Sequence, residues 1–355
     1  MTVNKDGKKW RVQLYYSDWQ GVRRKKNKRG FRTKAEGEEW GRNFLQQQQK
    51  SLDMNFENFV QVYYEDISHR LRENTMINKK YIINLKVTPY FKLKKMNEIT
   101  PPDIRAWQNK LLKEGYSETY LRTIHNQLSA IFNYATKYYN LRDNPCKKAG
   151  VIGKSNADRK EFWTTEEFKQ FLPSVSDKNE SRLAFLILYW TGIRIGELLA
   201  LTYEDINFEN RTISISKSYQ RLPGGREITN PPKTPKGNRI VTIPQFLSKE
   251  IEEYTKHLYG IMVHERIFRF TKSFMEHEIV RGVKESGVKR IRLHDLRHSH
   301  ASLLVENGLT PLAIAERLGH EKIETTLNTY SHLYPNKQGE LADMLDKINE
   351  VEEVK

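Results

Sequence analysis

Residues 293–301 read LHDLRHSHA, and residues 318–330 read LGHEKIETTLNTY. In the first stretch His294 and Arg297 are three residues apart, so a helix places both side chains on one face, from which they can point into one cleft. Such a face combines a group that transfers protons with a group that binds phosphate. In the second stretch Tyr330 follows His320 by ten residues, near the end of a polar helix-like run. A phenol at that place can swing to a phosphate in a groove.

Two upstream stretches add cations to this set. TGIRIGE (191–197) contains Arg194, and Glu197 follows three residues later, where it can orient the arginine. On its own, Arg194 would be interpreted as a surface residue paired with Glu197. PPKTPKGNR (231–239) places Lys233 and Lys236 at the tip of an expected hairpin. Either lysine can supply a proton at that tip, so both remain candidates at this point.

The histidines also raise the question of a metal site. His294 and His298 are four residues apart, a spacing found in helical zinc sites. However, Asp295 stands where an HExxH site has Glu, and Arg297 would set a cation beside the metal. No carboxylate cluster is left over to hold Mg²⁺. We therefore expect no metal and no other cofactor, and we expect His298 and His300 to be structural or to support their neighbours.

Composition limits the class of protein. A chain of 355 residues exceeds a usual single core, which favours two or three domains. Its 37% hydrophobic and 29% charged residues suit folded modules and are too polar for a membrane span. The sequence MTVNKDGKKW lacks the apolar run of a secretory signal, and the single cysteine, Cys146, cannot form an intrachain disulfide. We expect a cytoplasmic protein in which Cys146 is an unremarkable thiol in a linker.

Charge points to a polyanionic partner. The chain carries 60 Lys and Arg against 44 Asp and Glu, a net charge of +16. The first 50 residues hold 14 of these cations and only 5 of the acids, so the positive field is concentrated there. Nucleic acid is the partner that this distribution favours, and no membrane is expected.

The first 50 residues predict a small module. Residues 8–33 alternate apolar and polar side chains and turn near residues 18–21, which is typical of an antiparallel sheet. Thr33 and Glu36 form a capping-box pattern for a helix running toward Leu45. Cations gather beside Tyr15, Tyr16 and Trp19 and suit the phosphates around a β-ribbon in a major groove, unless they only solvate the hairpin. They are Arg23, Arg24, Lys25, Lys26, Lys28 and Arg29.

The middle of the chain predicts an all-helical module. QQQQK (46–50) interrupts the pattern as a linker, and helical spacing resumes from Phe56 and recurs over 75–87, 101–114 and 117–139. Pro145 is expected to end the last helix, and the Gly- and Lys-rich stretch up to residue 160 to be an exposed connector. GKS (153–155) is not a phosphate-binding loop, because GxxxxGK[ST] requires Gly where Lys148 stands.

The last part predicts a mixed module. A capped helix begins at Thr164, an apolar helix covers 183–190, and strands at 211–219 and 238–244 flank a PGGR turn in a small antiparallel sheet. Helices resume at Gln245. An apolar stripe at helical spacing packs within its own domain or on a neighbouring protomer. It comprises Leu341, Met344, Leu345, Ile348 and Val351.

Taken together, these residues resemble the tyrosine recombinase family, the phage and conjugative-transposon integrases, whose active site is an Arg, Lys, His-x-x-Arg, His, Tyr series. The resemblance assigns the catalytic set to Arg194, Lys233, His294, Arg297, His320 and Tyr330. Lys233 is favoured over Lys236 because its Lys-Thr pair is similar to the family's PKT turn, which leaves Lys236 as a DNA contact.

The resemblance covers the whole chain and implies a multidomain α+β protein. Residues 1–50 would be an arm-type DNA-binding domain of sheet plus helix, and 51–148 an all-α core-binding bundle. Residues 149–160 would be a linker, and 161–355 a mainly α catalytic domain with a small antiparallel sheet and a C-terminal helix.

The resemblance also implies an activity. Tyr330 would attack DNA and form a 3′-phosphotyrosyl bond, without ATP, to integrate and excise a phage or transposon. Implied partners are core and arm attachment sites, three further copies of the chain in a homotetramer, an excisionase and a DNA-bending host factor. The resemblance implies that the protein acts at the nucleoid, in the cytoplasm of a bacterial host. Two alternatives stay open: a type IB-like topoisomerase, which needs no second site, and a DNA-binding regulator that does not cleave.

Overall fold

A computed structural model describes residues 1–17, 23–48, 54–155, 161–232, 234–257, 262–331, 342 and 345–346. The chain divides into two compact units, Met1–Asp158 and Arg159–Lys355. Within the described part of the chain, no helix combines the length and apolar character needed to cross a bilayer. The predicted turn at 18–21 lies outside the described residues, and so does the predicted C-terminal stripe apart from Leu345.

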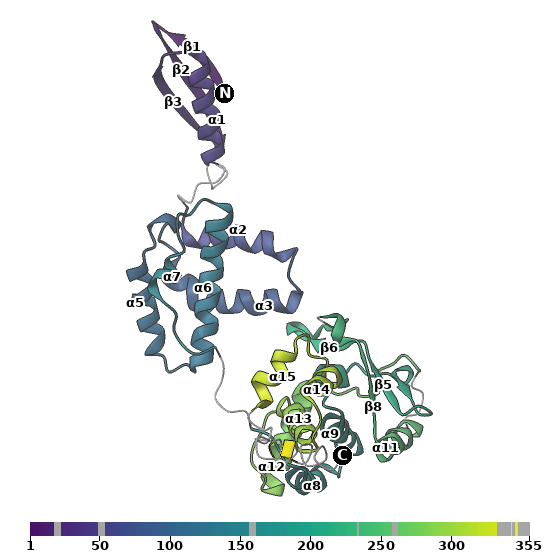
Figure 1. Cartoon of the computed structure of the whole chain (residues 1–355). Coiled ribbons are helices and arrows are strands. Elements are labelled where there is room, and N and C mark those ends of the chain that lie inside the picture. Colours follow the sequence, from purple (N-terminus) through teal and green to yellow (C-terminus); the bar gives the residue numbers. More distant parts are fainter. Residues whose placement is uncertain are drawn as a thin grey trace, which may run out of the picture. The chain divides into compact units, whose positions relative to one another are not determined.

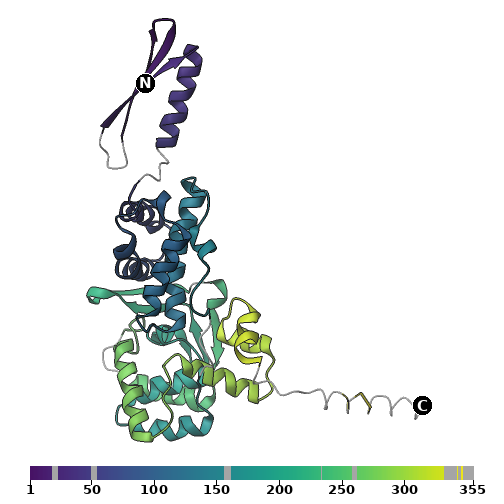
Figure 2. The same cartoon turned by 90° about the vertical axis from the view of Figure 1, so that its left-hand side faces the viewer.

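The N-terminal module is a three-stranded antiparallel sheet covered on one face by a helix (Figure 2). The side chains of Val12, Leu14 and Phe31 are buried between sheet and helix, where Trp40 and Phe44 of the helix pack on them. The predicted sheet and helix are confirmed. The elements are β1 (Thr2–Asp6), β2 (Lys9–Ser17), β3 (Arg23–Phe31) and α1 (Lys34–Gln48).

Two details of this module differ from the sequence prediction. Strand β1 pairs with β2 although its short TVNKD sequence carries little alternation to reveal it. Helix α1 continues to Gln48, so the glutamines at 46–48 belong to the helix and not to a linker. Glutamine has a good helix propensity, which allows the helix to continue there. At the start of the helix, Thr33 Oγ1 accepts from the Glu36 amide at 3.1 Å, as the capping pattern predicts.

The second module is all-helical, as predicted, and packs around one aromatic-rich core (Figure 1). Trp107, Phe56, Phe59, Phe91 and Phe132 are fully buried in it. The elements are α2 (Phe56–Ser68), α3 (Glu73–Ile82), a π-helical turn (Ile83–Val87), α4 (Thr88–Phe91), a 3-10 turn (Met96–Glu98), α5 (Pro101–Leu112), α6 (Glu118–Tyr138) and α7 (Pro145–Ala149).

The prediction around Pro145 was wrong. Helix α6 ends at Tyr138, and Pro145 begins α7, where its missing amide hydrogen is not needed. The side chain of Asn144 caps this helix by accepting from the Cys146 amide at 2.8 Å. Cys146 is fully buried, and Ala149 nearly so, because α7 packs against α5 and α6. The expected exposed connector therefore starts after α7, and Cys146 is a core residue.

The third module is mainly helical with two small sheets (Figure 1). Helix α9 lies at its centre and is apolar on nearly all sides, as a buried helix must be. The helices are α8 (Thr165–Phe171), α9 (Asn179–Thr191), α10 (Ile195–Leu198), α11 (Gln245–Lys256), α12 (Lys272–Ser286), α13 (Asp295–Glu306), α14 (Pro311–Leu318) and α15 (Ile323–Tyr330), with 3-10 turns at Leu172–Val175, Tyr203–Asp205, Pro223–Gly225 and Pro235–Gly237.

The strands of this module pair differently from the prediction. The expected strand over 211–219 is two strands, each in its own sheet. One sheet has the order β4-β5-β8, and the other is the β6-β7 hairpin, which closes through the PGGR turn. The strands are β4 (Ile206–Asn207), β5 (Thr212–Ile215), β6 (Ser218–Arg221), β7 (Glu227–Asn230) and β8 (Arg239–Thr242). The hairpin is thus an insertion between β5 and β8.

Arg317, near the end of α14, fixes the last part of the module to its centre. Its guanidinium donates to Nε2 of His300 on α13 at 2.9 Å, to the Thr242 carbonyl of β8 at 3.1 Å and to the Trp190 carbonyl of α9 at 3.2 Å. Burial and the neighbouring charge of Arg317 lower the pKa of His300 to about 3. His300 is therefore a neutral acceptor in the folded chain.

This environment makes the stability of the third module depend on pH. In the unfolded state His300 is protonated below about pH 6.5, whereas in the folded state it stays neutral down to about pH 3. Its contribution to the free energy of unfolding is therefore fully present above pH 6.5 and is lost as the pH falls toward 3. As the pH is lowered from 6.5 to 4.5, the free energy of unfolding of the wild type should decrease more steeply than that of His300→Gln, by about 1.4 kcal/mol per pH unit. The glutamine keeps an acceptor for Arg317. Urea unfolding of both chains tests this, and parallel pH profiles would refute it.

Candidate active site

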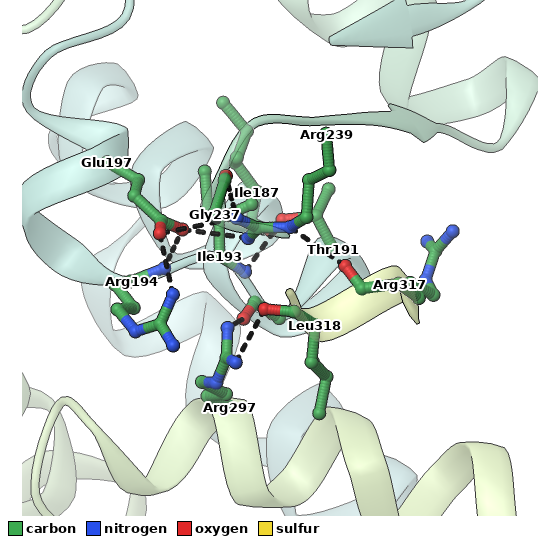
Figure 3. Close-up of polar contacts among 11 residues, drawn as sticks. Ile187, Thr191, Ile193, Arg194, Glu197, Gly237, Arg239, Arg297, Arg317 and Leu318 are labelled. Carbon is green, nitrogen blue, oxygen red and sulfur yellow. Dashed lines mark hydrogen bonds and ion pairs between the residues drawn. The ribbon is translucent and has the colours of Figure 1, made fainter. Parts of the chain in front are cut away.

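The site begins at Arg194, which precedes helix α10. Glu197, on the first turn of that helix, accepts from the Arg194 amide at 2.9 Å and from its guanidinium at 2.8 Å (Figure 3). The predicted orientation of Arg194 by Glu197 is confirmed. The spacing makes it possible, because a carboxylate three residues into a helix can reach back to the residue that caps it. Arg194 keeps 40% of its side chain exposed, while Glu197 is buried.

Arg239, the first residue of β8, holds the other side of the same carboxylate. Its guanidinium donates to Oε2 of Glu197 at 2.8 Å, to the Arg317 carbonyl at 2.9 Å and to the Gly237 carbonyl at 3.2 Å. Burial alone would raise the pKa of Glu197, but hydrogen bonds and charge from Arg239 and Arg194 hold it below its usual value. One carboxylate thus fixes two arginines from distant parts of the chain.

Arg297 lies on helix α13 and is buried. Its guanidinium donates to the carbonyl of Gly192 at 2.9 Å and to that of Leu318 at 2.6 Å (Figure 3). Gly192 caps the C-terminus of α9, and Leu318 is the last residue of α14. Helix C-termini carry partial negative charge, which explains why a cation is stable between them. Arg297 therefore joins the segment that carries Arg194 to the segment that precedes His320.

The charge of Arg297 is only partly balanced at this position. Burial lowers its pKa, and the repulsion of Arg194 acts in the same direction, while Glu197 opposes them. A guanidinium keeps its proton in proteins, so this environment appears as an electrostatic free-energy cost that a nearby anion reduces. A phosphate diester is such an anion, and its geometry matches that of the guanidinium fork.

A glycine brings the LGH segment against the lysine turn. Gly319 has a φ of +68°, and a β carbon there would lie 2.9 Å from the Lys236 carbonyl oxygen, so no other residue fits without a shift. His320 follows directly, and its Nδ1 lies 2.7 Å from Oγ1 of Thr326, a buried residue of α15. The close approach therefore places His320 beside the turn that contains Lys236. Lys233 lies outside the described residues.

Tyr330 is the last residue of α15 and is buried, with 3% of its surface exposed. Its phenol oxygen lies 2.6 Å from Nδ1 of His298 on α13. Burial raises the pKa of Tyr330, and the positive charge of Arg297 counteracts part of that rise. The phenol and the guanidinium of Arg297 thus share one electrostatic environment.

The structure groups the predicted residues unevenly. Arg194 and Arg297 lie together, as Figure 3 shows, and the positive charge of Arg297 lowers the pKa of Tyr330 relative to the effect of burial alone. His294 lies at the N-cap of α13, just before the helix that carries Arg297. It precedes the first turn of α13 and is exposed, with its ring edge-on to that of His298 at 5.3 Å between centroids.

Sequence reasoning missed two residues of this site, His298 and Arg239. His298 was expected only to support its neighbours, but it contacts the phenol of Tyr330. Arg239 was not singled out, although it is the buried partner of Glu197. The hydrogen bonds join residues 32 and 42 positions apart in the chain, and no local spacing signals such contacts.

Comparison with known proteins gives this geometry a family. Residues 161–337 match the phage integrase family, residues 55–112 its N-terminal SAM-like domain, and residues 2–48 an arm DNA-binding domain. The ICEBs1 integrase of Bacillus subtilis (strain 168) is 34% identical over 313 residues, which cover 84% of either chain. The chain belongs to the phage integrase family. It is a tyrosine-type, site-specific DNA recombinase, and DNA is its partner.

Solved integrase structures share the fold. The Tn1549 transposon integrase, solved with a circular intermediate DNA, superposes with a TM-score of 0.71 at 21% identity over 83% of this chain and 99% of that one. A lambda integrase dimer bound to a COC′ core site gives a TM-score of 0.60 at 18% identity over 95% of both chains. The predicted multidomain α+β fold is thereby confirmed.

In the arm module of this integrase, strand β3 divides the predicted DNA-binding cations between two faces. Val12 and Leu14 of β2 face the helix, and the register pairs them with Lys28 and Lys26. Lys28 accordingly lies over the ring of Trp40, at 4.8 Å from its centroid. Because neighbours alternate along a strand, every second cation points away from the helix. The open face carries Arg23, Lys25 and Arg29, and the helix side carries Arg24, Lys26 and Lys28.

The shared carboxylate of the integrase site leads to a stability prediction. Removing one partner of a buried ion pair leaves an uncompensated charge, so Arg239→Met should lower the free energy of unfolding by about 3–5 kcal/mol. The double variant Arg239→Met, Glu197→Leu removes both charges and should recover part of that loss. Chemical unfolding of the full chain measures both. Equal stabilities of the single and double variants would contradict the pairing.

Proposed function

We propose that this integrase integrates and excises a mobile genetic element by cleaving DNA through a 3′-phosphotyrosyl bond to Tyr330. The observation that carries the proposal is the position of Arg297 between Gly192 and Leu318. That position brings the Arg194 segment, the His320 segment and helix α13 around one guanidinium, whose positive charge opposes the rise that burial causes in the pKa of Tyr330. The same geometry suits a phosphate diester and the nucleophile that attacks it.

The two arginines bind the scissile phosphate in this proposal. The transition state of phosphoryl transfer gathers negative charge on the nonbridging oxygens, and donors fixed in advance stabilise it without further reorganisation. Glu197 holds Arg194, and main-chain carbonyls hold Arg297, so both guanidiniums are positioned by the fold. Removal of one such donor typically costs a factor of 10² to 10³ in rate.

The remaining residues of the proposed set handle protons. The departing 5′ oxygen needs a proton, and a lysine of the 231–239 turn is the proposed donor. Lys233 is the first candidate and Lys236 the second, which otherwise contacts DNA. His294 and His320 contact the phosphate or its protons, His294 from the start of α13 and His320 beside the lysine turn.

The modules divide the DNA among them in this proposal. Residues 1–50 bind arm sites through the open face of the sheet, residues 51–148 bind core sites, and residues 161–355 cleave, with 149–160 as the linker. Strand exchange between two sites requires four protomers, an excisionase and a DNA-bending host protein in at least one direction. The setting is the nucleoid of a bacterial cytoplasm, since the ICEBs1 integrase belongs to a bacterium.

The nucleophile can be tested directly. A nicked suicide substrate, in which the cleaved strand diffuses away, should trap a covalent protein–DNA adduct with the wild type and none with Tyr330→Phe, since phenylalanine lacks the attacking oxygen. Denaturing gels measure the adduct, and gel shifts confirm that both proteins bind the site. An undiminished adduct in Tyr330→Phe would remove the assignment, and relaxation of plasmids without an attachment site would favour a topoisomerase.

The division of β3 into two faces can be tested by matched charge changes. We expect Arg23→Gln, Lys25→Gln to weaken binding to arm-site DNA at least ~10-fold and to lower the salt dependence by about one counterion per lost phosphate contact. Arg24→Gln, Lys26→Gln removes the same charge from the helix side and should change both quantities much less. Affinity titrations at several salt concentrations measure this. Equal losses in the two variants would show that the faces do not differ in DNA binding.

A further inference from the structure

The phenol of Tyr330 and the imidazole of His298 contact each other beside a small apolar cluster. The tyrosine ring packs with Ala301, Ile314 and Leu318, all of them buried. His298 has 6% of its surface exposed and points Nδ1 at the phenol oxygen, at 2.6 Å. This distance is within the range in which a base takes a proton from a nucleophile.

The chemistry of a tyrosine nucleophile creates a demand that this pair can meet. A protonated phenol is a weak nucleophile and needs a neighbouring base or a lowered pKa. The surroundings of Tyr330 do not lower its pKa, because burial raises it. A base next to the phenol oxygen is therefore required, and an imidazole is the side chain best suited to that task near neutral pH.

The other imidazoles nearby have different neighbours. His300 accepts a hydrogen bond from Arg317, and burial holds its pKa near 3, too low for a useful base. His320 has Nδ1 at hydrogen-bond distance from Thr326. His294 lies exposed at the start of α13 and meets the edge of the His298 ring. A ring nitrogen of His298, in turn, contacts the phenol oxygen of Tyr330.

We propose that His298 is the general base that takes the proton of Tyr330 during DNA cleavage and returns it during rejoining. This rests on the proposed role of Tyr330 as the nucleophile. In cleavage the proton moves from the phenol oxygen to Nδ1 of His298, which becomes an imidazolium. The phenol oxygen forms a bond to phosphorus while the bond from phosphorus to the 5′ oxygen breaks, and the lysine of the 231–239 turn protonates that oxygen. Rejoining reverses each transfer.

The proposal separates the two proton transfers of the reaction. His298 acts on the attacking oxygen, and a different residue acts on the leaving oxygen. A DNA substrate with sulfur in place of the bridging 5′ oxygen distinguishes them, because a thiolate leaves without a proton. Loss of the lysine should be rescued by this substrate, whereas loss of His298 should not be.

The variant to measure is His298→Asn in the full chain. Asparagine keeps a polar group close to the position of Nδ1 but has no basicity, so a role in positioning survives the change and a role as base does not. Single-turnover formation of the covalent adduct should slow by about 10² or more on both the oxygen and the sulfur substrate. Melting temperature and DNA affinity should stay near those of the wild type. Lys233→Ala, or Lys236→Ala, is the matched control and should recover on the sulfur substrate.

A second measurement covers the case in which His298→Asn folds poorly. A fluorinated tyrosine incorporated at residue 330 has a more acidic phenol and depends less on a base. The rate deficit of His298→Asn relative to the wild type should therefore shrink in this background, whereas a deficit caused by misfolding should not.

Each result decides the question. Cleavage by His298→Asn at the wild-type rate or faster, or its rescue by the sulfur substrate, would overturn the role of His298 as base. Tyr330→Phe separates this failure from that of the proposed function. If Tyr330→Phe forms no adduct while His298→Asn cleaves normally, only the present inference fails, and if Tyr330→Phe still forms an adduct, the proposed function fails as well.

Discussion

The structure of the site depends on a shortage of negative charge around buried guanidinium groups. Arg239 and Arg297 are buried and Arg194 is half-exposed, and the carboxylate that joins two of them is that of Glu197. Arg297 donates hydrogen bonds to the main-chain carbonyls of Gly192 and Leu318, which carry partial charges only. Burying a cation without a full counter-charge costs free energy, so a diester phosphate that reaches this place is stabilised by charge that the fold has already desolvated.

The need of buried guanidinium groups for acceptors also explains how segments distant in the sequence are held together. Arg297 needs acceptors, and two helix ends, those of α9 and α14, supply them with aligned carbonyl dipoles. Arg317 and Arg239 then bind further carbonyls of α9, β8 and α14. The polar contacts therefore determine the positions of the loops that follow each helix, where Arg194 and His320 lie. Hydrophobic packing alone is non-directional and would not fix these loops to the same precision.

Local spacing accounts for what the sequence could predict. Arg194 and Glu197 are three residues apart, and Thr164 and Glu167 repeat the pattern at α8, so the caps and the helices followed from short motifs. The strand pairing of β5 with β8 spans an inserted hairpin, and Cys146 is buried by the packing of α7 against α5 and α6, which composition does not reveal. The contact of His298 with Tyr330 has the same origin. The choice between Lys233 and Lys236 stays a prediction.

Tyr330 and the arginines proposed to bind phosphate are held in place by different kinds of interaction. Tyr330 packs in a cluster of five buried residues, whereas the main core of the module contains α9 and most of its aromatic residues. Hydrophobic stabilisation scales with buried apolar area, so α15 gains much less from packing than α9 does. Its place depends to a larger degree on individual contacts such as those of His298 and His320. The position of the phenol therefore depends on a few directional contacts, whereas the arginines are fixed by main-chain carbonyls and by Glu197.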